Sequence, residues 1–154
     1  MLHAEKKKMR IILITILLFT LTKMSATTFC EKCDFEKVKI INDNLDNLTF
    51  EMIDEFLCTF DKSCENNVEF SEWSNEMLFI VLNKSTELYF KVLTIGKIEN
   101  AEIILEEIKN PIVEIDYQKI YDNIKKVDTQ EKLKKEYLRV LKIAAKKGGI
   151  KITD

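Results

Sequence analysis

Apolar residues recur three and four positions apart along most of this chain, and this spacing constrains the fold more than any other feature of the sequence. Residues spaced in this way share one side of an α-helix. The last helix predicted from the pattern carries Leu133, Tyr137, Val140, Leu141 and Ala144. No segment shows the sustained apolar and polar alternation of a half-buried strand. The sequence therefore predicts an all-α fold, a compact bundle or short stack of about six antiparallel helices.

Residues that cap or stop helices divide the chain into these segments. Side chains suited to an N-cap precede the apolar stripes at Thr49, Asn67 or Ser71, Ser85 or Thr86, Asn100 and Asp116. Asp128 and Glu131 stand three positions apart, as in a capping box that would open the last helix. Helix ends are predicted at Gly96, Asn110–Pro111 and Gly148–Gly149. Residues 34–44 fit either a short helix or an ordered arm.

The beginning of the chain has the layout of a secretory signal peptide. A basic head is followed by an apolar run over residues 11–21 and then by small polar residues. The run is shorter than the about 20 residues that a membrane-spanning helix needs, so an uncleaved anchor is the less favoured alternative. We predict a signal peptide over residues 1–26, an N-terminal arm with a Cys-x-x-Cys motif over 27–48, a helical domain over 49–149 and a tail over 150–154. We expect a secreted or periplasmic protein.

The four cysteines, Cys30, Cys33, Cys58 and Cys64, have three alternative roles. In an oxidising compartment an even number of cysteines in a small chain indicates disulfides, and we predict two. A zinc site is disfavoured because five residues separate the second pair, and a redox pair is disfavoured because cleavage of the signal peptide would leave no segment before Cys30 to form the strand that such a motif follows. Pairing of the first two cysteines with the last two is slightly favoured, and local pairing is the close rival.

Removal of residues 1–26 would also remove the only histidine, His3. It would leave 19 basic and 25 acidic residues, a net charge of −6. Without histidine the chain can form neither Ser-His-Asp nor Cys-His catalytic sites, nor an imidazole metal site. We therefore predict no catalytic residues, no metal and no cofactor. A net acidic, exported protein is also a poor partner for nucleic acid, and we expect a monomer.

Charge is segregated between the two parts of the predicted mature chain. Residues 27–116 hold 8 basic and 20 acidic residues, whereas residues 117–154 hold 11 basic and 5 acidic residues. The last helix therefore offers a candidate surface for an acidic partner or an anionic envelope, made of Lys132, Lys134, Lys135, Arg139, Lys142, Lys146 and Lys147. The alternative is that these cations pack beside the acidic half of their own chain. Phe79 lies off its apolar stripe and is a further candidate for an exposed contact.

Consecutive helix pairs of this size resemble HEAT-like or armadillo-like stacks, although no side-chain signature repeats at a fixed period. Residues 49–82, "TFEMIDEFLCTFDKSCENNVEFSEWSNEMLFIVL", resemble small secreted bacterial proteins of uncharacterised function. This resemblance implies no activity.

Two hypotheses for the function follow from these features. The first is an exported, non-enzymatic interaction module that binds a protein, a peptide or an envelope component, as an adaptor, an inhibitor or an immunity-type binder. The second is a thiol-disulfide oxidoreductase that uses Cys30 and Cys33. The absence of a recognisable catalytic motif favours the first.

Overall fold

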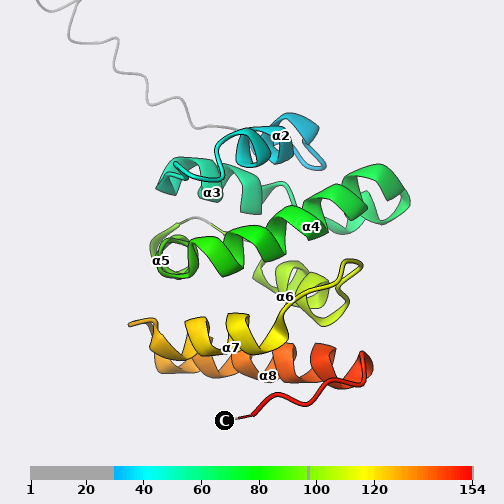
Figure 1. Ribbon diagram of the computed structural model, residues 1–154. Coiled ribbons are helices and arrows are strands. Elements are labelled where there is room, and N and C mark those ends of the chain that lie inside the picture. Colours follow the sequence, from blue (N-terminus) through cyan, green and yellow to red (C-terminus); the bar gives the residue numbers. More distant parts are fainter. Residues whose placement is uncertain (1–29, 97, 154) are drawn as a thin grey trace, which may run out of the picture.

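The computed structural model describes residues 30–96 and 98–153, and within them every regular element is a helix (Figure 1). The predicted signal peptide over residues 1–26 lies outside this part of the chain. The described elements are α2 (Phe35–Asp43), α3 (Phe50–Cys58), the short 3₁₀ helix η1 (Lys62–Asn66), α4 (Val68–Lys84), α5 (Thr86–Ile95), α6 (Ala101–Lys109), α7 (Tyr117–Lys126) and α8 (Glu131–Lys147). The predicted all-α, disulfide-stapled bundle is confirmed. No helix in residues 30–96 and 98–153 is long and apolar enough to cross a membrane.

The long helix α4 runs through the middle of the molecule and connects its two ends. Figure 1 shows α2 and α3 at one end and α7 and α8 at the other. Helix α4 packs against α2 on one side and against α5, α6 and α7 on the others. Helix α8 packs chiefly on α6 and α7. As a result, the outer side of α8 faces away from the rest of the bundle.

The core is made by the apolar stripes that the sequence pattern predicts. The residues of the α8 stripe are buried, except Leu133, which is half-buried, and Ile53, Phe56 and Leu57 of α3 are buried too. Tyr89 of α5 and Tyr137 of α8 are fully buried, and their hydroxyl oxygens lie 3.0 Å apart in a hydrogen bond. Burial raises the pKa of both hydroxyls, so both stay protonated at ordinary pH. The two hydroxyls hydrogen-bond to each other, so neither is left without a partner inside the apolar core.

Several helix starts follow the predicted caps. The side chain of Thr49 accepts a hydrogen bond from the Met52 amide at 3.3 Å, and that of Asp116 accepts one from the Lys119 amide at 3.0 Å. Asn67, rather than the alternative Ser71, caps α4. Residues 34–44 contain a helix, α2, because Asp34 caps it. The count of α-helices in the described residues is therefore seven instead of about six.

The predicted capping box at Asp128 is wrong, whereas the predicted stop of the same helix is confirmed. Helix α8 begins at Glu131, so Gln130 takes the N-cap position and makes no capping bond. The residue three positions on is then Leu133, which has no carboxylate to complete a box. At the other end Gly149 adopts a φ of 73°, and the Ile150 amide donates to the Ala145 carbonyl at 2.8 Å. This is a Schellman motif, which favours glycine at the left-handed position.

Candidate functional site

Two disulfides join the N-terminal segment to the end of α3 and to η1. Cys30 bonds Cys58, and Cys33 bonds Cys64, with Cα–Cα distances of 5.9 and 5.6 Å. We call these two bridges the clamp. The favoured pairing of the first two cysteines with the last two is confirmed, and local pairing is wrong. All four cysteines of the chain are used in the clamp.

Hydrogen bonds to the last carbonyls of α3 reinforce the clamp. The Cys33 amide donates to the Thr59 carbonyl at 2.9 Å, and the Lys32 ammonium donates to the Cys58 carbonyl at 2.8 Å. The Asn100 amide group also reaches the Cys58 carbonyl, at 3.3 Å, as well as the carbonyl of Phe60. Carbonyls at a helix end have no hydrogen-bond partner within the helix. Here the N-terminal segment and the start of α6 supply the missing donors. Sequence reasoning assigned Asn100 as an N-cap and missed this contact between distant segments.

The arrangement of the clamp bears on the redox and metal alternatives. Each cysteine of the Cys-x-x-Cys motif is bonded to a distant partner, so Cys30 and Cys33 do not share a bond. Within residues 30–96 and 98–153, no group of three or more His, Cys, Asp or Glu side chains is placed to hold a metal ion. The clamp acts as a structural staple, and such bridges fit an oxidising compartment.

Five of the seven predicted basic residues lie together on the outer side of α8. Successive residues of an α-helix are rotated by about 100°, so positions 132, 135, 139, 142 and 146 fall within one narrow sector. That sector is opposite the buried stripe centred on Tyr137 and Ala144. We call this set, Lys132, Lys135, Arg139, Lys142 and Lys146, the basic stripe. All its members are exposed except Lys142, which is half-buried.

The remaining two predicted residues hold α8 to its neighbours. The Lys147 ammonium donates to the Asn110 side-chain oxygen at 2.7 Å, and the Lys134 ammonium donates to the Lys125 carbonyl at 3.4 Å. The pKa of Glu106 is lowered, first by a hydrogen bond from Lys109 and then by nearby positive charges that include Lys147. Part of the basic charge thus does lie beside the acidic α6, as the alternative interpretation expected. Arg139 of the basic stripe also lowers the pKa of Glu106, so one member of the stripe lies near α6 as well.

Acidic side chains lie near part of the basic stripe. The Lys135 ammonium lies 3.7 Å from the Glu131 carboxylate, and the Arg139 guanidinium lies 3.8 Å from that of Glu136. Both pairs are exposed, where ion pairs contribute little and restrain the side chains weakly. The Lys142 ammonium lies 5.0 Å from the centre of the Tyr121 ring, and Lys125 of α7 lies 5.7 Å from the same centre. Lys125 therefore extends the positive surface onto α7.

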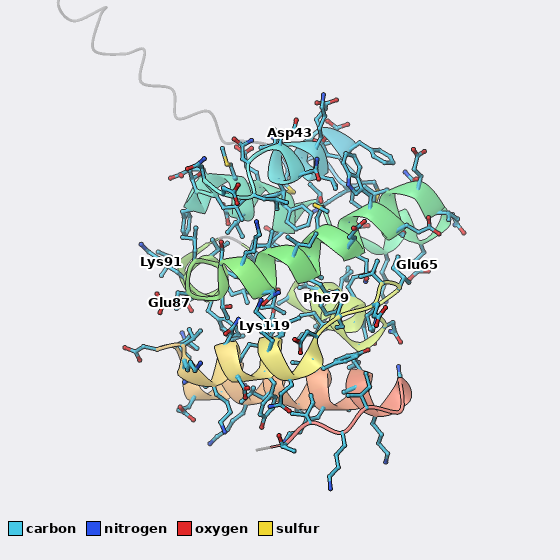
Figure 2. The ribbon with its side chains drawn as sticks, viewed as in Figure 1. Asp43, Glu65, Phe79, Glu87, Lys91 and Lys119 are labelled. Carbon is cyan, nitrogen blue, oxygen red and sulfur yellow. A yellow bond between two sulfur atoms is a disulfide. The ribbon has the colours of Figure 1, made fainter. Side chains whose placement is uncertain are left out.

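The expectation that Phe79 is exposed is wrong. Only 2% of Phe79 is accessible to solvent. Figure 2 shows it inside the molecule, beneath α4 and toward α6 and α7. A residue off the amphipathic stripe is usually exposed, but α4 has neighbours on several sides and buries most of its circumference.

Two hollows lie elsewhere on the molecule, and neither contains a residue of the basic stripe. The larger, of about 580 Å³, lies where α4, α5 and the end of α7 meet, and Lys84, Lys91 and Lys126 line it. The smaller, of about 110 Å³, lies beside Cys64 and is lined by Glu107 among others. Ligand pockets usually begin at about 300 Å³, so the smaller hollow does not fit a ligand of that class.

Glu107, in the smaller hollow, is the described carboxylate whose pKa is raised. Burial is the main cause, and a hydrogen bond from the Asn75 amide group at 2.7 Å opposes it. Asn75 is itself buried, donates to the Glu107 carbonyl and accepts from the Ile112 amide. The arrangement ties α4 to the end of α6 and to the loop beyond it. Its role is structural, because every polar atom of Asn75 is used in holding that junction.

Comparison with known proteins finds no match: no family model, no curated protein and no solved structure resembles this chain closely enough to identify it.

Proposed function

We propose that this protein is an exported helical interaction module that binds an anionic partner, a protein or an envelope component, through the basic stripe of α8, and that it turns over no substrate. The observation that supports the proposal most directly is the concentration of four exposed cations, with the half-buried Lys142 beside them, on the outer side of one helix. Exposed charges of one sign attract and orient an oppositely charged partner.

The charge of the rest of the molecule supports the same proposal. Residues 27–116 carry a net charge of −12, and residues 117–154 carry +6. The α8 end is therefore positive on a molecule whose predicted mature form is negative overall. Such polarity would present α8, rather than any other helix, to an anionic partner.

Export is the second part of the proposal. The predicted signal peptide over residues 1–26 and the two disulfides support it together, because disulfides persist in oxidising compartments. A HEAT-like stack that displays one end helix to a partner fits this role. Mass spectrometry of the exported product should show a terminus between residues 25 and 30.

Charge reversal on the stripe tests the binding proposal. In the triple variant Lys135→Glu, Arg139→Glu and Lys146→Glu, capture of the partner from the native envelope should be lost, whereas thermal unfolding should change little. A matched control reverses three exposed lysines on other helices, Lys39→Glu, Lys62→Glu and Lys91→Glu, with the same change in net charge.

Equal loss of capture in the two variants would show that net charge rather than α8 is responsible. Disulfide reductase activity that disappears in Cys30→Ser, without any specific capture, would favour the oxidoreductase hypothesis instead.

A further inference from the structure

The composition of the basic stripe is unlike that of a protein-binding site. Four of its five members are lysines and one is arginine. The centres of protein interfaces are enriched in Trp, Tyr and Arg and are depleted in Lys. The large apolar residues exposed in the described part of the chain include no aromatic; they are Val68, Ile95, Ile112 and Ile150. The α8 surface thus lacks the anchors with which proteins usually hold one another.

The shape of the stripe is also unlike that of a protein-binding site. It follows the outer side of a single helix for about 21 Å, from Lys132 to Lys146, at 1.5 Å per residue. Neither of the two hollows described above touches it. A peptide partner needs a groove or a sheet edge, whereas a row of flexible lysines on an outward-facing helix suits an extended anionic plane.

An exposed apolar side chain lies at the end of the stripe. Ile150 follows the Schellman motif that ends α8, and 48% of it is accessible to solvent. Its neighbour Lys151 is exposed too. The tail beyond is fixed, because the Thr153 amide donates to the Gln118 side-chain oxygen at 2.9 Å. Ile150 is therefore held between two anchored points, in the segment that directly follows the last lysines of α8.

We infer that the partner of the basic stripe is the surface of an anionic phospholipid bilayer, on which α8 lies with its cations toward the headgroups and Ile150 in the interfacial layer. This inference rests on the proposed function and names its partner. Each cation close to an anionic bilayer contributes separately to binding, and one apolar side chain adds contact with the acyl boundary. The acidic helix α3 and the neutral helix α2 lie at the opposite end of the molecule, away from the bilayer (Figure 1).

Co-sedimentation of the disulfide-bonded protein, residues 27–154, with vesicles tests the inference. One set of vesicles is pure phosphatidylcholine, and the other contains phosphatidylcholine and phosphatidylglycerol in equal parts. Binding is expected only to the second set, at about 0.1 M salt, with a steep loss at about 0.5 M salt. The stripe variant Lys135→Glu, Arg139→Glu and Lys146→Glu should bind at least about a hundredfold more weakly.

Two further variants make the test specific. The matched control Lys39→Glu, Lys62→Glu and Lys91→Glu should lose far less affinity, and Ile150→Ser should lose roughly fivefold. Thermal unfolding of each variant checks that it is folded.

Three results would overturn the inference: no binding to anionic vesicles at low salt, equal binding to phosphatidylcholine alone, or an equal loss in the matched control. If the protein does not bind anionic vesicles but captures an acidic protein through the stripe, the bilayer inference is wrong and the proposed function stands. If neither vesicles nor any partner is bound, both fall.

Discussion

Removal of one disulfide of the clamp should destabilise the protein by less than half as much as removal of both disulfides. The bridges span sequence separations of 28 and 31 residues, and they interleave: Cys33 lies inside the first loop and Cys64 lies outside it. Closure of a loop of this length lowers the entropy of the unfolded chain, which corresponds to about 3.6 kcal/mol at 25 °C. Either bridge alone would supply this amount.

The second bridge closes a much shorter path. With Cys30–Cys58 in place, the chain between Cys33 and Cys64 runs through that bridge and covers only about nine residues, which corresponds to about 2.6 kcal/mol. The double variant Cys33→Ala, Cys64→Ala should therefore lose about 2.6 kcal/mol, and removal of both bridges about 6 kcal/mol. The larger loss is comparable with the whole stability of a small domain.

Urea denaturation followed by circular dichroism measures the loss of unfolding free energy in each variant. The matched variant Cys30→Ala, Cys58→Ala should lose about as much as Cys33→Ala, Cys64→Ala. Reduction of the wild-type protein should reproduce the loss seen when all four cysteines are replaced. A total loss below about 1 kcal/mol would refute the reasoning, because it would mean that the hydrogen bonds from Lys32, Cys33 and Asn100 hold the N-terminal segment without the bridges.

Three smaller predictions test the core, the half-buried carboxylate of Glu107 and the helix end. Tyr89→Phe should cost about 1–3 kcal/mol, since it leaves the Tyr137 hydroxyl unpaired in the core, and the double variant with Tyr137→Phe should recover part of that loss in urea denaturation. The raised pKa of Glu107 means that the folded state binds the proton of this carboxyl more tightly than the unfolded state does. The contribution of Glu107 to stability therefore falls as pH rises from the usual carboxyl range toward neutral. Glu107→Gln should remove this pH dependence from unfolding free energies measured over a pH series. Gly149→Ala should cost about 1 kcal/mol because its φ is 73°, whereas Gly148→Ala, with only ordinary contacts around the added methyl group, should be nearly neutral in thermal unfolding.

Local features of this fold could be predicted from the sequence because neighbouring residues determine them. The caps at Thr49 and Asp116 act on amides three positions away, and the stop at Gly149 needs only the left-handed conformation that glycine accepts. The capping box at Asp128 failed for an equally local reason: the helix begins later than the pattern implies. Helix boundaries depend on small differences between alternative caps, and spacing alone does not rank them.

Features that depend on packing between distant segments could not be predicted in the same way. Phe79 is buried because α6 and α7 cover α4, and the periodicity of α4 carries no information about those neighbours. Asn100 and Asn75 likewise donate to carbonyls more than 30 positions away in the sequence. The five-residue sector could be predicted from the spacing of the residues around a helix, but the contacts that Lys134 and Lys147 make with Lys125 and Asn110 depend on how α8 packs.

The position of α8 makes binding and stability separable in this molecule. Its buried side packs on α6 and α7, and Tyr137 reaches the core through Tyr89, so the helix is fixed by contacts that the basic stripe does not share. The clamp fixes the opposite end, at α3 and η1, and α4 connects the two. Charges on the outer side of α8 therefore contribute little to folding, as exposed charges generally do. Lys132, Lys135, Arg139 and Lys146 are all exposed on this side, so reversal of their charges tests the proposed binding of an anionic surface with little effect on stability.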